Sequence, residues 1–132
     1  MRRTLALTVA VLFPGCARVP FTTDSLPAIR ASLASGRAVL LDVRENDEWF
    51  FGHLERARLF PLSRVQALTR APETLPADRP IYLYCAEGPR AQKAAAILLK
   101  YGLDARPIGK GYRALVAEGF EDVPMPRIRA AG

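Results

Sequence analysis

The segment CAEGPR at residues 85–90 combines residue types that together support thiol chemistry. Gly88 permits a crowded or left-handed backbone, so that successive amide N–H groups turn inward around one point. Pro89 suits the first turn of a following helix, whose positive end faces the same point, and Arg90 adds a fixed positive charge. Such surroundings favour a thiolate on Cys85, the nucleophilic form, and their backbone donors would hold an anion or a persulfide.

Cys85 also has an inert interpretation. A lone cysteine at the end of a strand is usually a small buried residue without chemistry. The glycine, proline and arginine that follow it favour a functional thiol instead. A thiol activated by backbone donors needs no histidine partner, which fits a chain with one histidine. That residue, His53, is interpreted as a structural hydrogen-bonding residue.

The chain offers no set of metal ligands, because it has a single histidine and only two cysteines, Cys16 and Cys85. We therefore expect neither a metal nor a cofactor. If Cys16 is removed or modified, one thiol is left and no internal disulfide is possible.

Two apolar runs of strand length, residues 38–43 and 81–85, lie among helical patterns. Because both runs are apolar throughout, they predict strands buried on both faces, and the alternation of strands and helices predicts an α/β fold with a mainly parallel sheet. In such a fold the ligand site lies at the carboxyl ends of the strands. Cys85 ends one run, and Asp42 and Arg44 end the other. The further expected elements are helices at 22–36, 45–53, 61–71, 89–101 and 109–119, and strands at 57–60 and 105–108.

Four segments in this order, residues 40–54, 57–62, 81–102 and 108–115, resemble a single-domain rhodanese of the sulfurtransferase superfamily. The resemblance covers residues 22–120. It implies a five-stranded, mainly parallel sheet with helices on both faces. It also implies that Cys85 accepts a sulfane sulfur from a small-molecule donor as a persulfide and passes it to a thiol or to cyanide. Its remaining implications concern the site: a substrate-binding loop of Ala86, Glu87, Gly88, Pro89 and Arg90, and a supporting role for Asp42 and Arg44.

Two other functions remain open. Glu87 inside the loop would repel a dianion such as thiosulfate if it faces the pocket, whereas in solvent its effect is about 1 kcal/mol or less. A catalytically weak binding or sensing module is therefore the alternative. A thiol-based phosphatase is a third candidate, although only four residues separate Cys85 from Arg90, a short ring for a phosphate.

Outside the loop, Arg56 and Arg58 are candidates for a basic rim around the site, or else plain surface residues.

Residues 1–16 have the layout of an export signal: two arginines, an apolar run, and small residues before a cut. We expect a lipoprotein-type signal with lipid on Cys16, and hence a periplasmic or cell-envelope protein attached to the membrane. Cleavage by an ordinary signal peptidase, or an N-terminal strand or helix of the mature domain, are the alternatives. Residues 121–132 are expected to be a C-terminal tail.

The net charge is +6, and arginine supplies sixteen of the nineteen basic residues. Apart from the adjacent Arg2 and Arg3, these arginines are scattered singly and do not alternate with aromatic residues, so we expect no nucleic-acid partner. Anionic small molecules fit a basic protein with such a loop better. The oligomeric state has no signal in the sequence.

Overall fold

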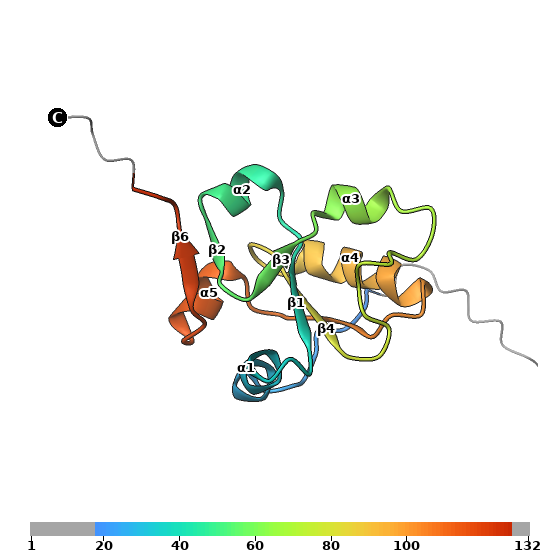
Figure 1. Ribbon diagram of the computed structural model, residues 1–132, viewed down its shortest axis with the longest axis horizontal. Helices are drawn as coiled ribbons and strands as arrows, with labels where there is room; N and C mark the ends of the chain where they lie inside the picture. The colour runs from blue at the N-terminus through green and yellow to red at the C-terminus, as the bar shows by residue number, and fades with distance from the viewer. Residues whose placement is uncertain (1–17, 128–132) are drawn as a thin grey trace, which may run out of the picture.

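A parallel sheet of four strands forms the centre of the computed structural model, which describes residues 18–127 (Figure 1). The strand order is β3 (Ala57–Leu59), β1 (Val39–Asp42), β4 (Ile81–Tyr84) and β5 (Ala105–Pro107). All three pairings are parallel, which confirms the predicted mainly parallel α/β fold.

The expected count of five strands is wrong for this part of the chain. The segment before the first helix, α1 (Leu26–Ala34), meets β5 through one backbone hydrogen bond, from Thr22 N to Pro107 O at 2.8 Å. Pro107 has no N–H to donate in return, so it cannot extend a ladder toward this segment. The segment lies along the edge of the sheet without forming a strand.

Helices cover both faces of the sheet, as predicted. On one face, α3 (Leu62–Gln66) and α4 (Pro89–Lys100) pack on Leu41 and Leu83 of the central strands. On the other face, α1 (Leu26–Ala34) and α5 (Tyr112–Ala117) pack on Leu40 and Tyr82. Neighbouring strand residues thus enter opposite cores, which is why β1 and β4 are buried along their whole length.

The sequence did not predict a small antiparallel pair at one end of the molecule, formed by β2 (Gly52–Leu54) and β6 (Asp122–Pro124) (Figure 1). β2 directly follows the short helix α2 (Asn46–Phe50). Residues 122–124, which fall in the expected C-terminal tail, form one strand of this pair. Within residues 18–127, no helix combines the length and the apolar character needed to cross a bilayer.

Candidate active site

Cys85 directly follows β4, and its side chain is 1% exposed. The backbone N–H of Gly88 donates to the Cys85 Sγ atom, with an N···S distance of 2.9 Å. Gly88 has a φ of 122°, a conformation that residues with a side chain rarely adopt, and it caps α4, which begins at Pro89. The loop therefore aims a backbone donor at the sulfur because a glycine occupies this position.

Two residues outside the loop pack closely against it. Neither of them was singled out from the sequence. Gly111 lies so close to it that an added Cβ would overlap the carbonyl of Ala86, and the next amide, Tyr112 N, donates to Cys85 O at 2.9 Å. On another side, an added Cβ on Gly88 would lie 2.9 Å from the ring of Phe21. The sequence signal for the contact of Gly111 is the pair of glycines that flank Lys110. No sequence signal pointed to Phe21.

Arg90 follows Cys85 by five residues, in the first turn of α4, and it is paired with Glu48. Its guanidinium makes two hydrogen bonds to the Glu48 carboxylate, of 2.5 and 2.8 Å. These bonds lower the pKa of Glu48, and they raise that of Arg90. The site therefore holds a neutralised pair beside the thiol rather than a free cation.

Asp42 and Arg44 form a buried ion pair at the carboxyl end of β1, with exposed fractions of 0% and 5%. The Arg44 guanidinium donates to both carboxylate oxygens, at 3.0 Å from Nε to Oδ1 and 2.6 Å from Nη2 to Oδ2. The Tyr84 hydroxyl also donates to Asp42 Oδ2, at 2.6 Å, and accepts from Leu54 N at 3.0 Å. Arg44 further donates to Gly52 O at 2.7 Å. The pair thus ties β1, β4 and β2 together next to the loop.

Tyr112 covers this network from α5. The Arg44 guanidinium lies over its ring, 4.3 Å from the ring centre. Burial, followed by the charge of Asp42, raises the pKa of Tyr84 well above its ordinary value. The phenol consequently stays protonated at physiological pH and serves as a donor to the carboxylate.

A cleft of about 340 Å³ opens beside the loop. Glu87 is exposed and lines this cleft; it does not contribute a hydrogen bond to the sulfur. The residues that line the cleft are Arg44, Glu48, Phe51, Gly52, Ala86, Glu87, Tyr112 and Arg113. The predicted basic rim is not here, because Arg56 and Arg58 line a separate hollow near Gly36, before the amino end of β1.

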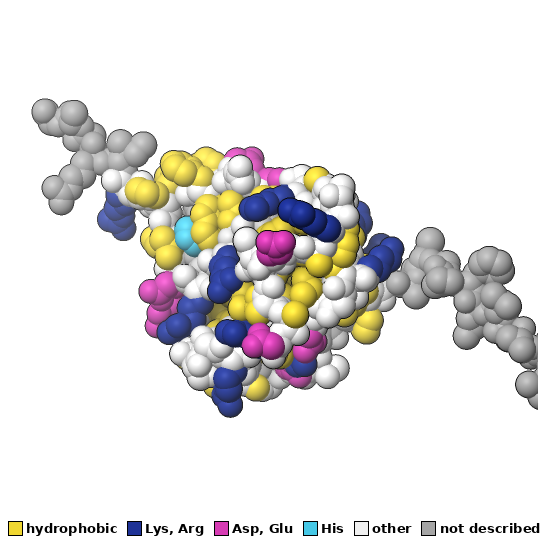
Figure 2. Space-filling model, turned by 45° about the vertical axis from the view of Figure 1, so that its right-hand side comes forward, with side chains coloured by type: hydrophobic (Ala, Val, Ile, Leu, Met, Phe, Trp, Pro, Cys, Tyr) yellow, Lys and Arg dark blue, Asp and Glu magenta, His cyan; other side chains and the backbone are white. Residues whose placement is uncertain are grey.

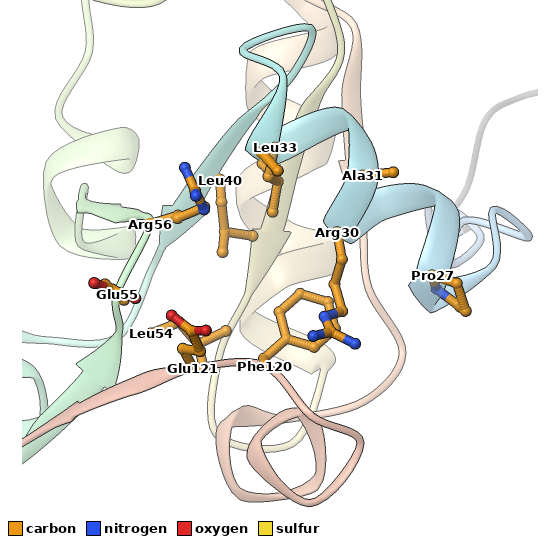
Figure 3. A pocket seen from close by; sticks show the side chains of 11 residues that line it. Pro27, Arg30, Ala31, Leu33, Leu40, Leu54, Glu55, Arg56, Phe120 and Glu121 are labelled. Carbon is orange, nitrogen blue, oxygen red and sulfur yellow. The ribbon is translucent and has the colours of Figure 1, made fainter.

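A further cavity of about 380 Å³ lies between α1 and the β2–β6 pair (Figure 3). Glu55 and Glu121 stand at its mouth, and Arg30 extends along Phe120. A hydrogen bond with Glu121 and the repulsion between the two carboxylates raise the pKa of Glu55. No residue of the Cys85 loop lines this cavity, so it is not part of the thiol site.

The remaining predictions have the following outcomes. His53 stacks on Trp49, with ring centres 3.4 Å apart, and its Nδ1 lies 3.0 Å from Trp49 O, which fits the structural interpretation. No group of three side chains suited to a metal occurs in the described range 18–127. Cys16 lies outside the described residues.

Comparisons with known proteins agree on one family. A family model described as "Rhodanese-like domain" matches residues 25–121. Among solved structures, the human single domain sulfurtransferase TSTD1 is similar at 30% identity and a TM-score of 0.62, over 73% of this chain and 96% of that chain.

Two curated bacterial proteins are also similar. The uncharacterized protein YqhL of Bacillus subtilis is 41% identical over 66 residues, 50% of this chain and 50% of that protein. The probable adenylyltransferase/sulfurtransferase MoeZ of Mycobacterium tuberculosis is 39% identical over 99 residues, 74% of this chain and 25% of that protein. The chain therefore spans half or less of the length of these curated relatives.

Proposed function

The chain belongs to the rhodanese-like domain family, and from this premise we propose that it is a sulfurtransferase that carries sulfur on Cys85. The Cys85 thiolate attacks the sulfane sulfur of a donor such as thiosulfate. A new S–S bond forms while the S–S bond of the donor breaks, and sulfite leaves with its electron pair. A thiophilic acceptor, cyanide or a thiol, then attacks the outer sulfur and Cys85 departs as the thiolate.

The observation that carries this proposal is the hydrogen bond from Gly88 N–H to the Cys85 sulfur, at 2.9 Å in a loop that also brings Arg90 near. A backbone donor fixed in this way stabilises negative charge on sulfur without any reorganisation during the reaction. The same donor can hold the charged outer sulfur of a persulfide. The partial resemblance of the chain to MoeZ and to the human single domain sulfurtransferase adds support.

Thiocyanate formation from thiosulfate and cyanide tests the proposal. The wild-type protein is expected to turn over and Cys85→Ser to form thiocyanate only at the uncatalysed rate, because a hydroxyl cannot form a persulfide. Folding of the variant is checked by its melting temperature. Equal rates for the two proteins would show that Cys85 does not carry the sulfur.

A second candidate, a rhodanese-like binding or sensing module with a slow thiol, is favoured by one observation: the Cys85 side chain is only 1% exposed. If the chain is a module of this kind, the wild type and Cys85→Ser should bind its partner with the same affinity. Neither form should transfer sulfur. Measured turnover in the wild type would exclude it.

We also propose that the chain is exported and attached to the membrane by lipid on Cys16. The support is the sequence of residues 1–16 alone. Replacing Cys16 with alanine should move the protein out of the membrane fraction of the cell. Retention of the variant in that fraction would contradict lipidation.

A further inference from the structure

The ring of Phe21 packs directly on the backbone of the thiol loop. A Cβ added to Gly88 would lie 2.9 Å from the Cζ atom of this ring, and a Cβ added to Gly109 would lie 3.3 Å from its Cγ atom. Because both neighbours are glycines, no side chain separates the ring from either backbone. Phe21 itself is 38% exposed, so it covers the loop on a side that faces solvent.

Gly88 is buried, whereas the residues directly before and after it are exposed. Its N–H is the group that donates to the Cys85 sulfur, and its φ of 122° lies in a region that glycine enters without strain. The freedom that allows this conformation also allows many others. Neighbouring atoms must therefore hold Gly88 in it, and the ring of Phe21 is in contact at this point.

The ring belongs to a segment, residues 18–25, that we name the N-terminal strap (blue in Figure 1). Hydrogen bonds fix the strap on both sides of the ring. Before the ring, Gln92 of α4 donates to Val19 O at 2.8 Å. After it, the Tyr82 hydroxyl of β4 donates to Asp24 Oδ2 at 2.7 Å. The ring is therefore held on the loop and is not a loose surface side chain.

We propose that Phe21 is a positioning residue for the thiol, whose ring holds Gly88 in the conformation that directs its N–H at the Cys85 sulfur. This inference deepens the proposed function and rests on it. Without the ring, Gly88 gains conformational freedom and contact with water, and its N–H leaves the sulfur for part of the time. The thiolate then loses a fixed donor, so a higher pH is needed to form it.

The charged groups around the loop are the same with and without the ring. They come from the loop itself, from α2, α4 and α5, and from the end of β1: Asp42, Arg44, Glu48, Glu87, Arg90 and Arg113. Four of them already form two ion pairs, between Asp42 and Arg44 and between Glu48 and Arg90. Figure 2 shows basic and acidic side chains interspersed over the face seen there. Substitutions of the uncharged ring therefore test the backbone donor.

The test is the pH profile of Cys85 alkylation by iodoacetamide. The rate reached at high pH corrects for access to the thiol, and peptide mass locates the label, since the chain has a second cysteine. The profile of Phe21→Ala should lie about one pH unit above that of the wild type, the size expected for weakening one hydrogen bond to a charged group.

Two further variants separate the positioning of Gly88 from the filling of space. Phe21→Leu keeps the Cβ and Cγ atoms, which meet Gly109, but has no atom at the place of Cζ, which meets Gly88. Phe21→Met has a similar volume and is long enough to reach that place. The profile of the leucine variant should therefore be shifted like that of Phe21→Ala, and methionine should bring it back toward the wild type.

Phe120→Ala is the matched control. Phe120 is 7% exposed and packs in the core on the opposite face of the sheet from Cys85. Its loss should lower the melting temperature at least as much as the loss of Phe21, but the alkylation profile should remain that of the wild type. A shift in this control as large as in Phe21→Ala would overturn the inference, because it would mean that any loosening of the fold disturbs the thiol.

The alkylation profile needs no sulfur donor, so it separates this inference from the proposed function. A wild-type profile in both Phe21→Ala and Phe21→Leu, in a protein that gains sulfur from thiosulfate, would overturn the role of Phe21 and leave the sulfurtransferase standing. A shifted profile in a protein that never forms a persulfide would support the role of Phe21 and refute the proposed function.

Discussion

Replacing Asp42 with asparagine should destabilise the fold strongly, because it leaves a buried arginine without its counter-charge. The Asp42 carboxylate accepts from the backbone N–H of Arg44 at 3.0 Å, from the Arg44 guanidinium and from the Tyr84 hydroxyl. An amide of the same size has only one accepting oxygen, and its NH₂ group would face donors. Arg44 would then be 5% exposed, charged and poorly satisfied.

Removing one partner of a buried ion pair costs about 3 to 5 kcal/mol. For a domain of this size, at roughly 4 °C per kcal/mol, the melting temperature should fall by about 12 to 20 °C. The assay is thermal unfolding followed by circular dichroism, with urea unfolding as an independent measure of the free energy. Asp42→Asn/Arg44→Met, which removes both charges, should lose less stability than Asp42→Asn alone.

Asp104→Asn is the matched control, since Asp104 pairs with Arg106 at 2.8 Å but its side chain is 46% exposed. Exposed pairs contribute about 1 kcal/mol or less, so this variant should melt within a few degrees of the wild type. A loss of less than about 1 kcal/mol in Asp42→Asn, equal to that of the control, would refute the reasoning. The buried pair would then not be needed to hold the strands together.

Three further substitutions test separate parts of the structure. Gly111→Ala should lower both the melting temperature and the rate of thiocyanate formation, because its Cβ would overlap the backbone of the thiol loop; unchanged values would contradict this packing. Arg90 lowers the pKa of Glu48, so wild-type stability should fall as the pH drops below the ordinary value of 4.5, and Glu48→Gln should flatten this dependence in melting curves recorded from about pH 3 to 6. Glu121 raises the pKa of Glu55, so the repulsion acts at neutral pH and vanishes in acid; Glu55→Gln should melt slightly higher than the wild type at pH 7 only, and a lower melting temperature there would contradict the repulsion.

The main sheet could be predicted because its central strands are apolar except for Asp42, the last residue of β1. A run such as residues 38–43 has one reasonable place, between two layers of helices, and the structure puts β1 there with every residue buried. The position of Cys85 followed from the same logic, since a strand end and a glycine before a helix together define a loop at the carboxyl edge.

The antiparallel pair could not be predicted from local patterns. β2 and β6 have three residues each, and β6 is exposed throughout and ends in Pro124. Such a short exposed segment has no periodicity of its own. It becomes a strand because residues about seventy positions away along the chain offer it hydrogen bonds.

The ion pairs within the site could not be predicted from sequence spacing either. Glu48 lies four residues after Arg44, a spacing that suggests a pair on one helix, but it binds Arg90 instead. Arg44 is already held by Asp42 on the strand. The direction of Glu87 depends on how the loop curls around the sulfur, which is set by contacts with Gly111 from another part of the chain.

The most direct test of the central claim is the intact mass of the protein after incubation with a sulfur donor and then with cyanide. We expect a gain of one sulfur atom with thiosulfate, located on Cys85, absent from Cys85→Ser and removed by cyanide as thiocyanate forms. A gain with polysulfide but not with thiosulfate would keep the persulfide and show that the surroundings of Glu87 exclude the dianion. No gain with either donor would contradict the account that Cys85 carries sulfur.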